Sequence, residues 1–149
     1  ITAIGSKDKN TPWKIGIQDP DGETGEYLGY ISISDKSVST SGDYQRYFIK
    51  NGVRYHHIID PHTGYPAETD IRSVTVISDS AEKSDALSTV AFMAGSEKAY
   101  ELIEKTGNAD AIIITKNNKV ILTSDAKSYF TLTKAEKYAV LAKNFHKNS

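Results

Sequence analysis

The hydrophobic pattern changes its period once, and this change constrains the fold more than any other feature of the sequence. Apolar and polar residues first alternate, as in Trp13–Gln18 and Tyr27–Ile33, which is typical of half-buried strands. From Ser80 to Ala94 the apolar residues recur at helical spacing, and Gly95 is placed to end that helix. A second helical segment, Ser96–Lys105, precedes further strand-like runs. The pattern predicts an α+β fold: a mostly antiparallel sheet with two helices inserted between strands and packed on one face.

Turn residues divide the rest of the chain into short elements. Asn51-Gly52 is a strong hairpin signal, and it joins the runs Tyr44–Ile49 and Val53–Ile58. Ser96 is placed to cap the second helix and Gly107 to stop it. The other expected elements are strands at Ser37–Thr40, Ser73–Ile77, Ala109–Thr115, Val120–Thr123 and Tyr129–Leu132, and a terminal helix at Lys134–Phe145.

Composition limits the class of protein. The 149 residues have the length of one ordinary domain, and 38% of them are apolar. A formal net charge of −1 gives no electrostatic bias toward nucleic acid or an anionic membrane. The absence of cysteine excludes disulfides, thiolate metal sites and a cysteine nucleophile. The start, Ile1–Gly5, has the pattern of a strand end entering a turn, so we expect a fragment of a larger domain.

Three of the four histidines lie within seven residues, at His56, His57 and His62. Neighbouring residues on a strand face opposite sides, so His56 and His57 cannot both point into one site. The turn sequence Asp60–Gly64 follows, which places His57 at a strand end. A histidine there can act as a general base toward a hydroxyl, or it can be an ordinary surface histidine. A zinc site is a weaker alternative, because no nearby spacing completes a tetrahedral ligand set.

A carboxylate and a hydroxyl share one face of the first predicted helix. Asp85 and Thr89 are four residues apart, so their Cβ atoms lie about 6 Å apart. Both groups can ligate Mg²⁺ and leave coordination positions open for phosphate oxygens. An aspartate near a helix start is also favoured by the helix dipole alone, and that alternative stays open.

A third and weaker pattern is Ser41-Gly42 followed by Arg46. Glycine allows a backbone to approach a ligand closely, and arginine binds phosphate through a forked pair of donors. A glycine that ends a strand is common, so this pattern carries little weight by itself.

Several ordered motifs resemble the ApbE family of flavin:protein FMN transferases. Thr40–Tyr44 followed by His57–Gly64 is similar to the paired motif of that family. The other matching segments are Trp13–Pro20, Ser73–Val76, Ser84–Thr89 and Ala94-Gly95. The resemblance spans about residues 1–125. It implies a T-fold-like ApbE domain, of which residues 1–149 would form the C-terminal portion without the N-terminal half.

The resemblance also implies a reaction, in which FMN moves from FAD to a Thr or Ser hydroxyl of a target protein and AMP is released. His57 would be the base. Mg²⁺ would bind to Asp85 and Thr89, with Ser88 as a further ligand or as a group that orients water. The flavin nucleotide would contact Ser41, Gly42, Arg46 and Ile59.

The family's N-terminal half supplies much of the FAD site, so we expect the isolated chain to lack full activity. We also expect it to pair with that half or with another chain. Two alternatives remain open: a Mg²⁺-dependent FAD pyrophosphatase giving FMN and AMP, and a non-catalytic flavin-binding or structural fragment. The implied partner is an acceptor flavoprotein. The implied location is extracytoplasmic, in the periplasm or at the cell surface, with a lipid anchor on an N-terminal segment outside this chain.

Overall fold

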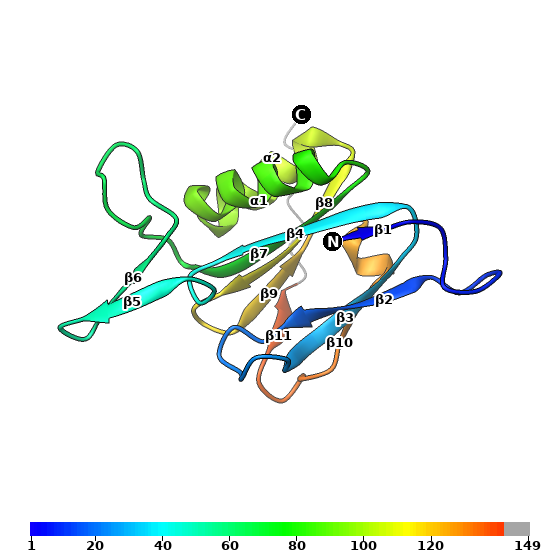
Figure 1. Ribbon diagram of the computed structural model, residues 1–149, viewed down its shortest axis with the longest axis horizontal. Helices are drawn as coiled ribbons and strands as arrows, with labels where there is room; N and C mark the ends of the chain where they lie inside the picture. Colours follow the sequence, from blue (N-terminus) through cyan, green and yellow to red (C-terminus); the bar gives the residue numbers. More distant parts are fainter. Residues whose placement is uncertain (142–149) are drawn as a thin grey trace.

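A six-stranded sheet forms the centre of the computed structural model, which describes residues 1–141 (Figure 1). All its neighbouring strands are antiparallel except the last pair, which is parallel. In spatial order the strands are β1 (Thr2–Ala3), β4 (Lys36–Gly42), β7 (Ile71–Ser78), β8 (Ala109–Thr115), β9 (Lys119–Leu122) and β11 (Ala139–Leu141).

Different layers cover the two faces of this sheet. Helices α1 (Ala81–Ala94) and α2 (Ser96–Thr106) pack on one face. A three-stranded sheet packs on the other, in the order β10 (Phe130–Leu132), β3 (Tyr27–Ile33), β2 (Trp13–Gln18), together with the short 3-10 helix η1 (Ala126–Ser128). The predicted α+β fold with both helices on one face is confirmed, but the pattern did not predict the second sheet opposite them.

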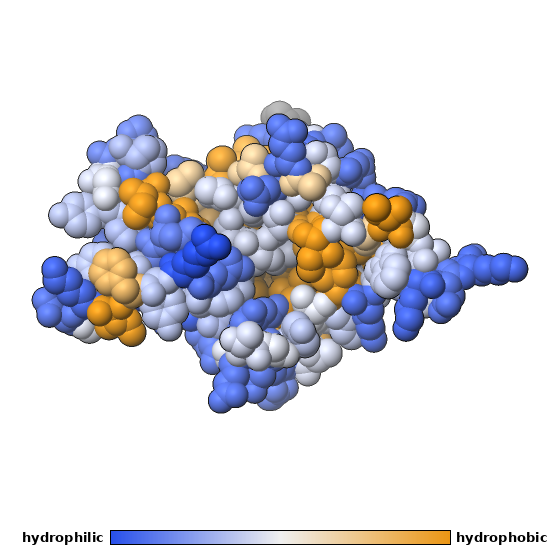
Figure 2. Space-filling view, in the orientation of Figure 1, coloured by the Kyte–Doolittle hydropathy of each residue, from blue (hydrophilic) through white to orange (hydrophobic). Residues whose placement is uncertain are grey.

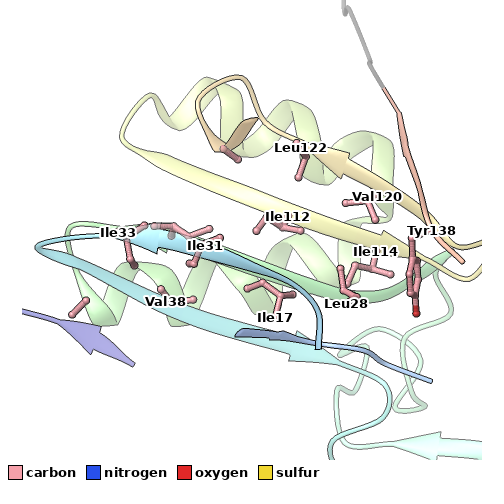
Figure 3. Packing of buried hydrophobic residues seen from close by; sticks show 13 residues of the cluster. Ile17, Leu28, Ile31, Ile33, Val38, Ile112, Ile114, Val120, Leu122 and Tyr138 are labelled. Atoms are coloured by element: carbon pink, nitrogen blue, oxygen red, sulfur yellow. The ribbon is translucent and has the colours of Figure 1, made fainter. Parts of the chain in front are cut away.

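Burial on both faces explains the most apolar run of the sequence. All four residues of Ala111–Ile114 in β8 are fully buried. Ile112 and Ile114 point into the cluster shared with the three-stranded sheet (Figure 3). Ala111 and Ile113 pack against the helices. A strand covered on both sides needs no polar face, so alternation disappears there.

A separate hairpin leaves the layers at the end of β4. It consists of β5 (Tyr47–Lys50) and β6 (Val53–His56), which pair only with each other among the described strands. Asn51 and Gly52 have φ angles of 52° and 77°, as a two-residue hairpin turn requires. The predicted hairpin is confirmed, with strands shorter than the pattern suggested.

The cap of α2 differs from the prediction. Gly95, at a φ of 80°, precedes the helix, and Ser96 is its first residue. Asp70 takes the capping role, because its carboxylate accepts hydrogen bonds from Ser96 N at 2.9 Å and from Ser96 Oγ at 2.6 Å. A carboxylate at this position satisfies an otherwise unpaired N–H and complements the helix dipole. Asp70 lies 26 residues earlier in the chain, beyond the reach of a local capping pattern.

The predicted helix at Lys134–Phe145 is wrong over its described part. Ala135–Lys137 form a turn, and β11 follows beside β9. The remainder, residues 142–145, lies outside the described residues. The carboxylate of Asp19 is the physical reason, since Lys134, Lys137 and Tyr138 all donate hydrogen bonds to it. Asp19 is only 1% exposed, and satisfying its charge outweighs the helical spacing.

No helix within residues 1–141 combines the length and apolar character that crossing a membrane requires.

Replacing Asp19 with Asn should lower the free energy of unfolding by about 3 kcal/mol at neutral pH, because it breaks a buried ion pair. Burial by itself would raise the pKa of Asp19, but hydrogen bonds from Lys134, Tyr138 and Lys137 hold the pKa well below its usual range. The stabilisation is therefore complete above the unfolded pKa of about 4 and is lost as the pH falls below it.

Urea unfolding of both proteins between about pH 7 and pH 2 measures this effect. The exposed Glu136→Gln, in the same segment, is the matched control and should change little at any pH. A difference between wild type and Asp19→Asn that stays constant over the whole pH range would contradict the assignment.

Candidate functional site

His57 lies directly after β6, where the hairpin returns to the body of the molecule. Its backbone N–H donates to the carbonyl oxygen of Arg46 at 3.1 Å, and its Nδ1 lies 3.2 Å from the same oxygen. A carbonyl oxygen only accepts, so Nδ1 carries the proton when the ring is neutral. Nε2 then presents a free lone pair, which can accept a proton from a hydroxyl. The predicted position of His57 at a strand end is confirmed.

His56 faces the other side of the hairpin and is buried. Its Nε2 lies 3.2 Å from the carbonyl oxygen of Ala67, and its ring meets that of Phe92 edge-on at 5.5 Å between centroids. Burial lowers the pKa of His56, which keeps the ring neutral at physiological pH. The two histidines diverge as predicted, and His56 belongs to the packed interior.

A cavity of about 370 Å³ joins His57 to residues from β4, α1 and the loop after β6. It brings together four of the predicted site residues, which come from segments far apart in the sequence. Hydroxyls and apolar groups share its wall, so it can hold a ligand that has both kinds of surface. The residues that line it are Ser41, His57, Ile58, Ile59, Pro61, Thr89 and Met93.

Hydroxyl groups connect β4 to α1 beside this cavity. Ser41 Oγ lies 2.9 Å from Ser88 Oγ and 3.3 Å from Thr89 Oγ1. Ser88 is fully buried, and its hydroxyl also donates to the carbonyl oxygen of Asp85 at 2.9 Å. These short side chains let α1 lie close to β4, and their hydroxyls form hydrogen bonds with one another. Ser88 therefore acts in this packing, and the prediction that it binds metal remains a prediction.

Asp85 lies one turn before Thr89 on α1, and its side chain is exposed. It lines a second cavity of about 650 Å³ between β2 and β4, whose lining includes Ile15, Val38 and Thr40. Figure 2 shows apolar surface in this region, between β4 and β2. The two predicted metal ligands therefore line different cavities: Thr89 lines the first and Asp85 lines the second.

The described residues offer a limited choice of metal ligands. Within residues 1–141, no three side chains of His, Asp or Glu are grouped so that they could hold a metal ion. This gives no support to a zinc site built from the neighbouring histidines. The Asp85 carboxylate and the Thr89 hydroxyl are hard oxygen donors, which suit a cation such as Mg²⁺ that completes its shell with water or phosphate oxygens.

Gly42 and Arg46, the remaining predicted binding residues, act here through packing and backbone. A side chain at Gly42 would lie 2.7 Å from the ring of Tyr44 and 3.0 Å from the carbonyl oxygen of Arg72, so glycine makes room for the protein's own groups. Arg46 is exposed, and its carbonyl oxygen orients His57. Only the guanidinium of Arg46 was expected to bind, so this contact of its backbone carbonyl with His57 was not predicted. The Asn51-Gly52 turn was the signal for it, since the hairpin register places Arg46 opposite His57.

The turn after His57 has the predicted form. Asp60 accepts hydrogen bonds from His62 N through its side chain at 2.9 Å and from Gly64 N through its carbonyl at 2.8 Å. Gly64 has a φ of 71°, which favours glycine. This turn carries Ile59 and Pro61 to the wall of the cavity.

Known proteins resemble the chain over most of its length. A family model described as the ApbE family matches residues 1–113. The FAD:protein FMN transferase of Treponema pallidum is 44% identical over 108 residues, which cover 72% of this chain and 30% of the relative. That of Haemophilus influenzae is 39% identical over 137 residues, which cover 90% and 39%. The crystal structure of the ApbE protein from Thermotoga maritima is 41% identical, with a TM-score of 0.74, and the match covers 84% of this chain and 40% of that one.

The chain therefore spans 30% to 40% of the length of these relatives.

The geometry predicts opposite neutral tautomers for the two adjacent histidines. His57 should carry its proton on Nδ1 and His56 on Nε2, because each of these atoms faces a carbonyl oxygen. Long-range ¹H–¹⁵N correlation spectra at about pH 8, assigned with His57→Gln and His56→Gln, distinguish the two forms. Finding His57 protonated on Nε2 would remove the free lone pair on which its predicted role as a base depends.

Proposed function

This chain belongs to the ApbE family, and we propose that it forms the C-terminal part of a domain that transfers FMN from FAD to a protein. The observation that carries the proposal is His57, whose Nε2 is free to accept a proton in a cavity shared with Ser41 and Thr89. The relatives that match most of the chain are named FAD:protein FMN transferases, which supports this reaction for the site.

In the proposed reaction a Thr or Ser hydroxyl of the acceptor attacks the phosphorus of the FMN half of FAD. The new O–P bond forms as the P–O bond of the pyrophosphate breaks, and AMP leaves with that electron pair. Nε2 of His57 takes the hydroxyl proton. The carbonyl oxygen of Arg46 then stabilises the charged ring, because the bond from Nδ1–H to it strengthens when the donor is ionised.

We propose Mg²⁺ as the cation of this site. Asp85 and Thr89 would hold it, since they present a carboxylate and a hydroxyl one helical turn apart. When bound, the cation would neutralise charge on the pyrophosphate. Ser88 lies beneath this pair, bonded to Ser41 and to the Asp85 carbonyl, and would fix the turn that carries the ligands.

The proposed acceptor is a flavoprotein that carries the target Thr or Ser, and the proposed compartment is extracytoplasmic, with a lipid anchor on an N-terminal segment. Only the family resemblance supports these three points.

Incubating the complete domain with FAD, Mg²⁺ and a Thr-containing peptide tests the reaction. Covalently flavinylated peptide and AMP should appear in equal amounts. His57→Ala should slow the transfer at least about 100-fold, because general base catalysis is lost. His62→Ala, an exposed histidine five residues later, is the control and should stay within about twofold. Release of free FMN and AMP without labelled peptide would identify a pyrophosphatase. Binding of FAD without cleavage would identify a non-catalytic module.

Asp85→Asn should raise the Mg²⁺ concentration for half-maximal activity more than about tenfold, because a ligand charge is removed. The same variant should weaken Mg²⁺ binding in calorimetric titrations with FAD present, and its melting temperature should change little because the side chain is exposed. Glu82→Gln, an exposed carboxylate in the first turn of α1, is the control. Equal losses in both variants, accompanied by lower melting temperatures, would assign Asp85 to the helix dipole.

A further inference from the structure

The β5–β6 hairpin and the loop after it carry an unusual share of the exposed apolar surface. Six of the twelve exposed large apolar side chains among the described residues lie between positions 47 and 65. They are Tyr47, Phe48, Ile49, Val53, Ile59 and Tyr65. Neighbouring strand residues face opposite sides, so Phe48, Lys50 and Val53 lie on the His57 side of the hairpin, while Tyr47 and Ile49 lie on the His56 side. The side that carries Phe48, Lys50 and Val53 is called the hairpin surface below. Figure 1 shows the hairpin standing clear of the three layers, and Figure 2 shows an apolar group on it beside hydrophilic residues. Apolar groups clustered in this way mark an interaction site more often than chance exposure does.

The hairpin surface is held in place from its base. Asp43, which is 5% exposed, lies between Arg72 of β7 at 2.8 Å and Arg54 of β6 at 3.5 Å. Arg54 also lies over the ring of Tyr47, 4.3 Å from its centroid. These charged contacts fix the hairpin relative to the central sheet, so a partner would meet a preformed surface.

The hairpin surface is continuous with the cavity of His57. Ile59 lines that cavity and is also 46% exposed, and Arg46 opposite His57 leads directly into β5. From there the hairpin extends for four residue pairs, or about 13 Å at the rise of a strand. A ligand that fills the cavity and also covers the hairpin must be longer than the reacting hydroxyl and its neighbours, which suits a polypeptide segment.

The charge of this region favours an acidic partner. Residues 43–65 contain three basic side chains, Arg46, Lys50 and Arg54, and two carboxylates, Asp43 and Asp60, which gives a formal net charge of +1. Asp43 offsets the charge of Arg54, so Arg46 and Lys50 carry the excess. The whole chain has a net charge of −1. Basic groups beside exposed apolar groups complement a segment that carries both carboxylates and apolar side chains.

We propose that the hairpin surface docks the acceptor protein, through a segment that carries carboxylates and apolar side chains beside its target hydroxyl. This inference rests on the proposed function. The apolar side chains of the segment would cover Phe48 and Val53, which lie on the same side of the hairpin as His57, and its carboxylates would approach Lys50. Docking in this way directs the hydroxyl toward Nε2 of His57 and gives the reaction its selectivity among exposed Thr and Ser residues.

Steady-state kinetics of the complete domain test the docking surface. The probes are a peptide with one Thr flanked by Asp and Leu, and the same peptide with Lys in place of Asp. Val53→Ser and Lys50→Glu alter the hairpin surface, away from the residues that line the His57 cavity. The matched controls are Ile4→Ser, which is 80% exposed directly after β1, and Lys98→Glu, which is exposed on α2.

Each hairpin variant should raise KM for the acidic peptide at least about fivefold, the effect expected of an interface residue. The KM for FAD and kcat should stay within about twofold, and both controls should match wild type. Lys50→Glu should prefer the Lys peptide, and this reversal should fade with added salt.

Unchanged peptide KM values in both hairpin variants, with transfer intact, would overturn the docking surface and leave the proposed function standing. Lower melting temperature or weaker FAD binding in Val53→Ser, but not in Ile4→Ser, would show that the hairpin packs inside the complete domain, and this also overturns docking. Absence of covalent flavin with the wild-type domain would overturn the proposed function and the docking proposal together.

Discussion

Burial of the central sheet on both faces is the constraint on which the rest of the structure depends. β7 and β8 lie in the middle of that sheet, and their apolar side chains alternate between two separate clusters. Such strands fold only if two other layers cover them at once. The helices supply one layer and the strands around Ile17 and Ile31 supply the other. This arrangement leaves β4 near the edge of the sheet. Among the described strands, β7 lies on one side of β4 and the two-residue strand β1 lies on the other.

The candidate site forms at this edge because α1 packs on β4 through short polar side chains. Ser84 and Ser88 are fully buried and meet Ser39 and Ser41 through their hydroxyls, at 3.3 Å and 2.9 Å. Larger apolar side chains would hold the helix farther from the strand, and Thr89 would then lie farther from Ser41. Serine at these positions contributes little hydrophobic stabilisation, and the helix is instead anchored by Ala91 and Phe92 near its end. The packing that brings Thr89 to the cavity of His57 is therefore polar, while the stability of the helix comes from its last turn.

Local signals predicted most elements, whereas contacts between distant segments could not be read from the sequence. Asn51-Gly52 set the hairpin register, and that register alone places Arg46 opposite His57. The opposite directions of His56 and His57 followed from strand geometry. The cap that Asp70 provides and the cluster around Asp19 join residues 26 and more than 100 positions apart, so no local pattern reports them. The prediction of a terminal helix was wrong for this reason. The spacing of its apolar residues was helical, but the buried carboxylate of Asp19 binds Lys134 and Lys137 in another backbone geometry.

The site combines two kinds of support, and each suits a different part of the proposed transfer reaction. Ser41 and Thr89 come from layers that are buried on one side, so their positions are fixed by the packing of the whole domain. His57 comes from a hairpin that touches the layers mainly at its base, where Asp43 binds two arginines. A nucleotide needs a rigid wall, because its phosphate must be held in line with the attacking oxygen. A protein acceptor needs a wall that stands free of the body, because a folded partner cannot enter a closed cleft. In the proposed reaction, a base at the junction of the two walls would transfer the proton at the point where both substrates meet.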